Sequence, residues 1–347
     1  MRSASSAVVV VLLLAPLAAQ DMKPPEPAAE LAKLKPLVGT WEGKGTVHMA
    51  PGTEPMAWTA QSAYEWTLGN HFVKCDMNID FGGNMPTLVF REYYGWDRET
   101  KRYVFLALSN TGEAHLAELT FVAENTFATL VTKKGPEGLA SERGITTITK
   151  DGMEFVMTKF GTSGPAADVV KGKFSRVEKL KPLAIEATAA MAPVPEAMAK
   201  IHRTVGTYEV AGEMTMMPGT PVMKITGTDT ARSIFGGAVL YIATKGVAEH
   251  SPDPYFADNY LVWNADKGCY DAFGLDNMGW VGVMEQRFEG DTKLVATNAQ
   301  VFMGQPTTNR MVVELDANGK MTRVTGYSCC GSSDPYCSFK GTYKLSK

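Results

Sequence analysis

The sequence has few of the residues and motifs on which most enzymes and nucleic-acid binders depend. Its 347 residues include five histidines and five cysteines, and 34 Lys and Arg nearly balance 37 Asp and Glu. The net charge of −3 supplies no basic stripe, so we expect no nucleic-acid partner. There is no G-x-S-x-G, H-E-x-x-H, P-loop or G-x-G-x-x-G motif, so the sequence offers no motif-based evidence for a hydrolase, a metalloprotease or a nucleotide-binding enzyme.

Long apolar runs are also absent beyond residue 20. The earlier run over 7–15 is shorter than the roughly 20 residues that span a bilayer, and it follows Arg2 and precedes small residues up to Ala19. This layout predicts a signal peptide over 1–19, cleaved near Ala19, and a secreted or periplasmic protein; a retained anchor is the alternative. The Pro- and Ala-rich stretch 20–29 predicts a disordered leader.

The rest of the chain contains an internal repeat. Val38–Met56 aligns without a gap on Val205–Met223 with ten identities in nineteen positions, an offset of 205 − 38 = 167 residues. The register continues over more than a hundred positions, which indicates a tandem duplication of one domain. We therefore expect domains at 30–178 and 196–347, joined by an Ala/Pro-rich linker at 179–195.

Helical periodicity is confined to the start of each copy, where Leu31, Leu34 and Val38 form one apolar stripe. Short β-rich runs follow, separated by turn signals such as Asp151-Gly152. The sequence therefore predicts an all-β fold of two tandem antiparallel meander β-barrels of the lipocalin or calycin kind, each preceded by a short helix. A barrel of about eight to ten strands is wide enough to hold one small molecule.

The opening of the first copy resembles a known family. Its Gly-x-Trp-x-Gly-x-Gly pattern, followed by Tyr94-Gly95-Trp96-Asp97, is similar to the GTW-x-G opening and GYD turn of the bacterial domain-of-unknown-function family 1579. The resemblance implies a lipocalin-like or nitrobindin-like barrel. In the second copy Val210 replaces the middle glycine. We expect structural roles for the motif residues of both copies: Gly39, Trp41, Gly43, Gly45, Gly206, Tyr208 and Gly212.

Nitrobindins hold haem through a histidine late in the domain, but neither copy has a histidine in its last strands. We therefore expect no cofactor. A Met-rich segment over 214–223 has the thioether groups that bind Cu(I), but methionine more often fills core gaps, and no His or Cys clusters nearby; we expect no metal.

Aromatic and cationic side chains are the candidate ligand contacts, although core packing is the simpler role for each aromatic residue. An inward-facing Arg91 would bind a carboxylate through both of its terminal nitrogens, whereas strand alternation equally allows it to face water. His71 would serve as a ligand contact, an acid–base group or a cap. The predicted ligand-binding residues are Trp66, His71, Arg91, Tyr93, Trp96, Arg232, Tyr260 and Trp263.

Several cysteines in an exported chain favour a disulfide. Cys337 lies across a short loop from Cys329 and Cys330 and is predicted to bridge to one of them, with Cys329 and Cys337 as the candidate pair. The adjacent pair would not bridge to itself because its geometry is wrong. Cys75 stands alone in the first copy and is expected to be a buried thiol.

The positions preserved in both copies are glycines, prolines and aromatics rather than acids, bases or nucleophiles. This pattern favours a non-enzymatic exported protein that binds a small apolar or amphipathic ligand, with no catalytic residue. One alternative is an enzyme that uses His71, Arg91 or His115. Another is an envelope interaction protein whose two domains pack on each other and present loops such as 251–254.

Overall fold

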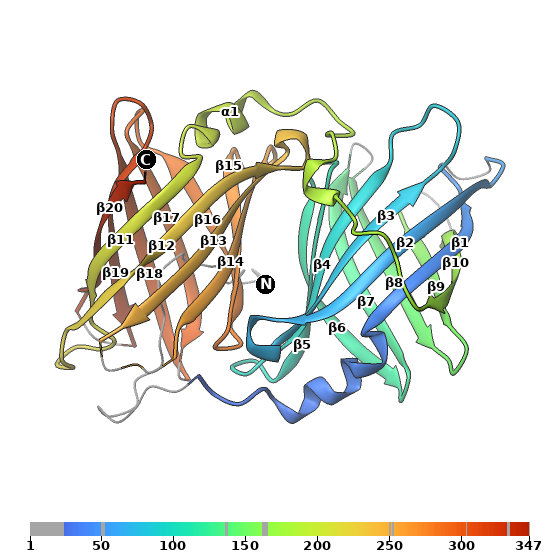
Figure 1. Cartoon of the computed structure of the whole chain (residues 1–347), viewed down its shortest axis with the longest axis horizontal. Helices are drawn as coiled ribbons and strands as arrows, with labels where there is room; N and C mark the ends of the chain where they lie inside the picture. Colours follow the sequence, from blue (N-terminus) through green and yellow to red (C-terminus); the bar gives the residue numbers. More distant parts are fainter. Residues whose placement is uncertain are drawn as a thin grey trace. The chain divides into compact units, whose positions relative to one another are not determined.

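The computed structural model describes residues 24–346, apart from 50–52, 136–137, 162–165, 250, 252, 303 and 332–333. The expected signal peptide, the first residues of the leader and Pro252 of the loop at 251–254 lie outside the described residues. Pro27–Ala192 and Pro193–Lys347 form separate compact units, and each contains a closed ten-stranded antiparallel barrel (Figure 1). This confirms the predicted all-β fold of two tandem barrels.

Barrel 1 is a meander in which the first and last strands pair to close the sheet. It is preceded by the 3-10 helix η1 (Ala29–Leu37) and followed by η3 (Ile185–Ala187); η2 (Leu68–Asn70) joins its second and third strands. Its strands are β1 (Gly39–Val47), β2 (Met56–Thr67), β3 (Phe72–Asp80), β4 (Leu88–Asp97), β5 (Arg102–Ser109), β6 (Ala114–Ala123), β7 (Thr126–Gly135), β8 (Gly138–Ile148), β9 (Met153–Phe160) and β10 (Ala167–Val177).

Barrel 2 repeats this plan after the helix α1 (Glu196–His202), with η4 (Phe235–Gly237) in the place of η2. Its first eight strands start 167 residues after their counterparts, as Gly206 follows Gly39 (206 − 39 = 167). The strands are β11 (Gly206–Met214), β12 (Met223–Ile234), β13 (Val239–Ala248), β14 (Tyr255–Asn264), β15 (Cys269–Asp276), β16 (Val281–Phe288), β17 (Lys293–Phe302), β18 (Gln305–Leu315), β19 (Met321–Cys330) and β20 (Tyr336–Leu345).

A short helix packs on the core at one end of each barrel. In η1 the buried residues are Leu31, Leu34 and Leu37, because a 3-10 helix places residues three apart on one face; Val38, expected in that stripe, is only half-buried. In barrel 2, Met198 and Ile201 of α1 join the core. No helix in the described part of the chain is both long and apolar enough to cross a membrane.

The glycine and tryptophan motif builds the seam where β1 meets β10. Gly45 pairs with Gly172, and the Trp58 ring fills the space over both, so a Cβ on Gly45 would lie 1.9 Å from the carbonyl oxygen of Lys171. Trp41 is buried and its Nε1 donates a 2.9 Å hydrogen bond to the Leu37 carbonyl. The motif therefore closes the barrel and ties it to η1.

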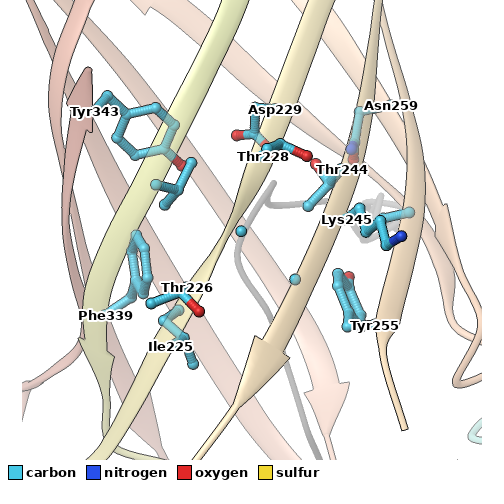
Figure 2. Close-up of a pocket in the computed structure, with 14 residues that line it drawn as sticks. Ile225, Thr226, Thr228, Asp229, Thr244, Lys245, Tyr255, Asn259, Phe339 and Tyr343 are labelled. Carbon is cyan, nitrogen blue, oxygen red and sulfur yellow. The ribbon is translucent and has the colours of Figure 1, made fainter. Parts of the chain in front are cut away.

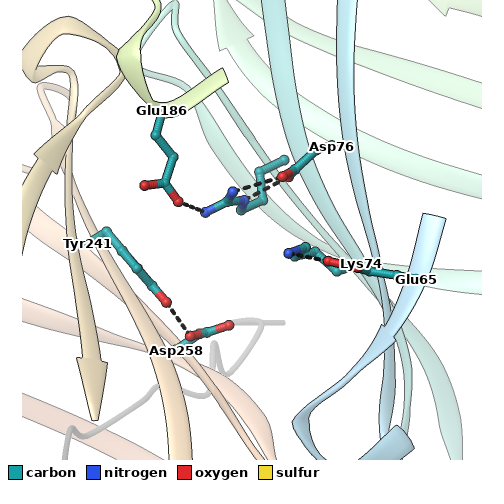
Figure 3. Close-up of polar contacts among 7 residues, drawn as sticks. Glu65, Lys74, Asp76, Glu186, Tyr241 and Asp258 are labelled. Carbon is teal, nitrogen blue, oxygen red and sulfur yellow. Dashed lines mark hydrogen bonds and ion pairs between the residues drawn. The ribbon is translucent and has the colours of Figure 1, made fainter. Parts of the chain in front are cut away.

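Part of the stretch expected as a linker at 179–195 packs on barrel 1, where the Met191 N–H donates to the Asn110 carbonyl at 2.8 Å. Arg91 of β4 ties this segment to the barrel. Its Nε and Nη2 donate to the two carboxylate oxygens of Asp76 at 2.8 and 2.9 Å, and its Nη1 donates to Oε1 of Glu186 in η3 at 2.6 Å (Figure 3). The Asn110 side chain also donates to the Ala189 carbonyl at 2.9 Å.

We expect Arg91→Met to lower the free energy of unfolding by about 2–3 kcal/mol, because it leaves two carboxylates facing each other in a largely buried site. Arg102→Met breaks an exposed ion pair with Glu118 and is expected to cost about 0.5 kcal/mol or less. Urea denaturation compares the two, and limited proteolysis reports release of the segment after barrel 1. Equal losses in the two variants would contradict this role for Arg91.

Candidate functional site

The lumen of barrel 1 is lined by alternate residues of each strand, those in register with the buried core. At the end of the lumen away from η1, several inward-facing apolar side chains keep exposed surface. These are Val47, Met77, Ile79, Ala107, Phe155 and Val170. The lumen is therefore not filled to core density at this end, and its apolar wall is available for contact.

A chain of polar side chains crosses the middle of this lumen. The Tyr94 hydroxyl donates a 2.6 Å hydrogen bond to Oε2 of Glu92, and the Tyr64 ring lies 6.0 Å from that of Tyr94. Burial raises the pKa of Glu92 to about 7, although the bond from Tyr94 opposes the shift. Burial also raises the pKa of Cys75, which hydrogen-bonds with Tyr64. At neutral pH Glu92 therefore exchanges readily between donor and acceptor forms.

Two buried polar groups on β2 have no hydrogen-bond partner among the described residues: Nε1 of Trp58 and Oγ of Ser62. Both residues alternate with neighbours that are exposed or half-buried and face the lumen, and Ser62 has no exposed surface. An unpartnered buried polar group costs about 1–3 kcal/mol of desolvation. A ligand atom or water in the lumen would remove that cost.

Barrel 2 encloses two small cavities of about 30 and 40 Å³, and Asp229 and Tyr343 line both. The surface of both is mostly apolar, and the polar side chains of Thr244, Tyr255 and Asn259 lie along the first (Figure 2). Asp229 is 3% exposed, and burial raises its pKa to about 6 against the opposing hydrogen bonds of Thr244 and Tyr343. Each cavity has space for about two or three water molecules.

The two lumens carry their acids on different strands. At the repeat offset, Ser62 on β2 corresponds to Asp229 on β12 (229 − 62 = 167). Glu92 on β4 corresponds to Asn259 on β14 (259 − 92 = 167). Both positions are polar in both copies, and in each copy one of them is a carboxyl group.

The structure places three of the predicted ligand residues on the lumen faces. Trp66 and Trp96 pack partly buried against the core of barrel 1, and Trp263 does so in barrel 2. All three lie at the end nearest the helix, away from the polar groups of the lumens. Trp96 stands edge-on to Tyr103 at 4.8 Å between ring centroids, a core contact.

The other five predicted ligand residues are not brought together with the lumen groups. Arg91 and Tyr93 alternate with the inward Glu92 and Tyr94, so both point away from the lumen, and contact of Arg91 with a ligand carboxylate stays a prediction. Arg232 lies over the Tyr241 ring, Tyr260 stacks on that ring, and Tyr241 donates to Asp258 at 2.5 Å (Figure 3).

The two histidines that the sequence analysis named as candidate functional residues lie in different parts of barrel 1. His71 follows η2, and its backbone N–H caps that turn by donating to Leu68. His115 faces the lumen of barrel 1 opposite Ala107, with its Nε2 3.4 Å from Oε2 of Glu113.

No disulfide joins any of the five cysteines, so the predicted bridge between Cys329 and Cys337 does not form in this structure. Cys337 pairs with Tyr327 across β19 and β20, which makes Cys329 its diagonal neighbour rather than its partner. Elsewhere Cys269, Asp271 and Glu285 lie within 4.8 Å of one another. Lys267 already pairs with both carboxylates of that group, at 2.9 and 3.3 Å.

Sequence reasoning missed the groups that define the lumens: Trp58, Ser62, Glu92, Tyr94, Asp229 and Tyr343. The available signal was the repeat itself, in which the positions of Ser62 and Glu92 change residue yet stay polar. That signal identifies lumen residues only once the structure shows that these two positions face the inside of the barrel.

Comparison with known proteins gives one family match and distant structural likenesses. The model of the family described as "Protein of unknown function (DUF1579)" matches residues 26–176. Rv2717c from M. tuberculosis is similar at 14% identity and a TM-score of 0.34, over 44% of this chain and 99% of that one. A DUF3598-family protein of unknown function from Nostoc punctiforme is similar at 10% identity and a TM-score of 0.28, over 92% of this chain and 100% of that one. No curated protein matches. Scores this low carry no argument about activity.

Proposed function

We propose that the barrel of residues 26–176, which match the model of the DUF1579 family of proteins of unknown function, binds a small, mainly apolar molecule with one polar end. One observation carries the proposal: two unpartnered buried donors and a carboxyl group face a lumen whose apolar wall keeps exposed surface. Binding sites of this kind combine an apolar lining with few, convergent polar groups.

The polar groups specify the inserted end of the ligand. Trp58 donates only, so its Nε1 requires an acceptor such as a carbonyl or hydroxyl oxygen. The Ser62 hydroxyl accommodates either an acceptor or a donor. An anionic head group would meet Glu92, which is partly ionised at neutral pH because its pKa is about 7. The inserted end is therefore neutral, as in a long-chain alcohol or ketone.

The proposed function is binding without turnover. The sole thiol near the site, Cys75, is buried and its pKa is raised well above the usual value, so it stays a protonated and weak nucleophile. The proposal includes export, which rests on the sequence pattern over 1–19.

Displacement of a fluorescent probe tests the proposal. N-phenyl-1-naphthylamine is expected to gain fluorescence on binding the full chain, and 1-dodecanol should displace it at least tenfold more effectively than dodecanoate at pH 7.5. Trp58→Phe keeps the ring and removes the donor, and Ser62→Ala removes the hydroxyl. Each is expected to weaken dodecanol binding about three- to tenfold, the effect of one hydrogen bond.

Thr59→Ala is the matched control, because Thr59 is exposed on the outer face of the same strand. It should leave displacement unchanged. The proposal fails if the probe does not bind, or if dodecanol binds the Trp58 and Ser62 variants as well as it binds the control.

A further inference from the structure

The interior of barrel 2 presents buried carboxyl groups and no cation. Asp229 and Asp276 are both almost fully buried. Among the described residues that line the two cavities, the one cationic side chain is Lys245. Its nitrogen lies 5.8 Å from the centroid of the Phe256 ring, and Figure 2 shows it turned away from Asp229.

A buried carboxylate without a cation is an unfavourable arrangement. Buried charges in proteins are normally paired with an opposite charge or bound to a metal, because desolvation is costly. Hydroxyl groups of Thr244 and Tyr343 stabilise the ionised form of Asp229 in part. Asp276 differs, because the backbone N–H groups of Met278 and Trp280 donate to it at 2.9 and 3.0 Å. Asp229 is therefore the carboxyl group that lacks a full partner.

The two cavities share Asp229 and differ in the other polar side chains that line them. In the first cavity, Thr244, Asn259 and Tyr255 line the wall together with the Asp229 carboxyl group. The second cavity is lined mostly by apolar side chains. The apolar lining of the second includes Ile201, Leu240, Ile242, Leu261, Met311 and Val313. A molecule that occupies both would need a polar, positively charged end and a short apolar end.

We propose that barrel 2 binds a compact primary ammonium ion, with its nitrogen beside the Asp229 carboxylate and its alkyl end in the apolar cavity. The three protons of a primary ammonium match the acceptors of Asp229 and its neighbouring hydroxyl oxygens. Cavities of about 30 and 40 Å³ fit a head group and a tail of a few carbon atoms, so the alkyl chain is short.

This site is distinct from the one proposed in barrel 1, where Ser62 stands at the position of Asp229. The inserted end of the barrel 1 ligand is neutral, and its test uses Trp58 and Ser62 variants. The two proposals therefore fail independently.

Isothermal titration calorimetry of the full chain at pH 7.5 and 150 mM NaCl tests the barrel 2 site. The probes are propylammonium chloride, 1-propanol and sodium propionate, which share a three-carbon chain and differ in head-group charge. Propylammonium is expected to bind saturably, at least tenfold more tightly than the other two. Asp229→Asn should weaken its binding at least tenfold, and the exposed Asp266→Asn should leave it unchanged.

Two further measurements keep the test decisive if Asp229→Asn does not fold. Ala257 lines the polar cavity and is buried, so Ala257→Leu should fill the space and abolish binding. Lowering the pH from 7.5 to 5 should weaken binding by the wild-type chain about tenfold, because Asp229 becomes protonated below its pKa of about 6. Equal binding of propylammonium and 1-propanol, binding that survives Ala257→Leu, or no saturable binding would overturn the proposal.

Discussion

Gly45→Ala is expected to lower the free energy of unfolding by about 3 kcal/mol or more and to be the most damaging glycine substitution in the motif. The added Cβ would lie 1.9 Å from the Lys171 carbonyl oxygen and 2.5 Å from the Trp58 ring. The backbone of β10 cannot move away without breaking the pairing that closes the barrel. Urea denaturation followed by tryptophan fluorescence measures the loss.

Gly43→Ala is the matched control. Its Cβ would meet only the side chain of Phe174, at 2.4 Å, and a ring can turn where a backbone cannot. The second copy has Val210 at this position, opposite Tyr343, which shows that the barrel accommodates a larger residue there. We expect a loss of about 1–2 kcal/mol. A Gly43 variant as unstable as the Gly45 variant would contradict this account of the seam.

The free energy of unfolding of barrel 2 is expected to rise as the pH falls from 8 to about 5. Burial raises the pKa of Asp276 to about 7 and that of Asp229 to about 6, both above their unfolded values. The folded state therefore holds these protons more tightly. The stabilisation is complete below about pH 4 and is lost as the pH rises through 6 and 7. Each group should contribute on the order of 1–3 kcal/mol.

Asp276→Asn isolates the larger contribution, because the amide oxygen can still accept from Met278 and Trp280. The variant should flatten the dependence between pH 5 and 8, and combination with Asp229→Asn should flatten it further. Denaturant midpoints across this range provide the measurement, with the exposed Asp266→Asn as control. A steeper profile in the variants, or greater wild-type stability at pH 8 than at pH 5, would refute the assignment.

The repeat and the barrels were predictable because their signals are local. Glycines and aromatics recur at one offset, and the turn signals between short β-rich runs define a meander. The 3-10 form of η1 was not predictable, because the spacing of Leu31 and Leu34 fits an α-helix and a 3-10 helix equally well. Only the burial of Leu37 distinguishes the two helix types.

The lumen groups were not predictable for a different reason. Alternation along β4 separates Arg91 from Glu92 but does not say which of them faces inward until the barrel closes. The sequence drew attention to Arg91 for its charge, whereas the structure satisfies that charge with Asp76 and Glu186. Glu92 passed unnoticed between large aromatic residues because nothing local marks a carboxyl group as buried.

The alternate placement of the acids has a consequence for their titration. Ser62 and Glu92 lie on strands separated by one other, roughly 10 Å across the sheet. A barrel with acids at both of these positions would hold two carboxyl groups whose mutual repulsion raises the pKa of one of them. Only one of the two positions carries an acid in each barrel, so this coupling is absent from both. An Asn259→Asp variant would place a second carboxyl group near Asp229 and introduce it.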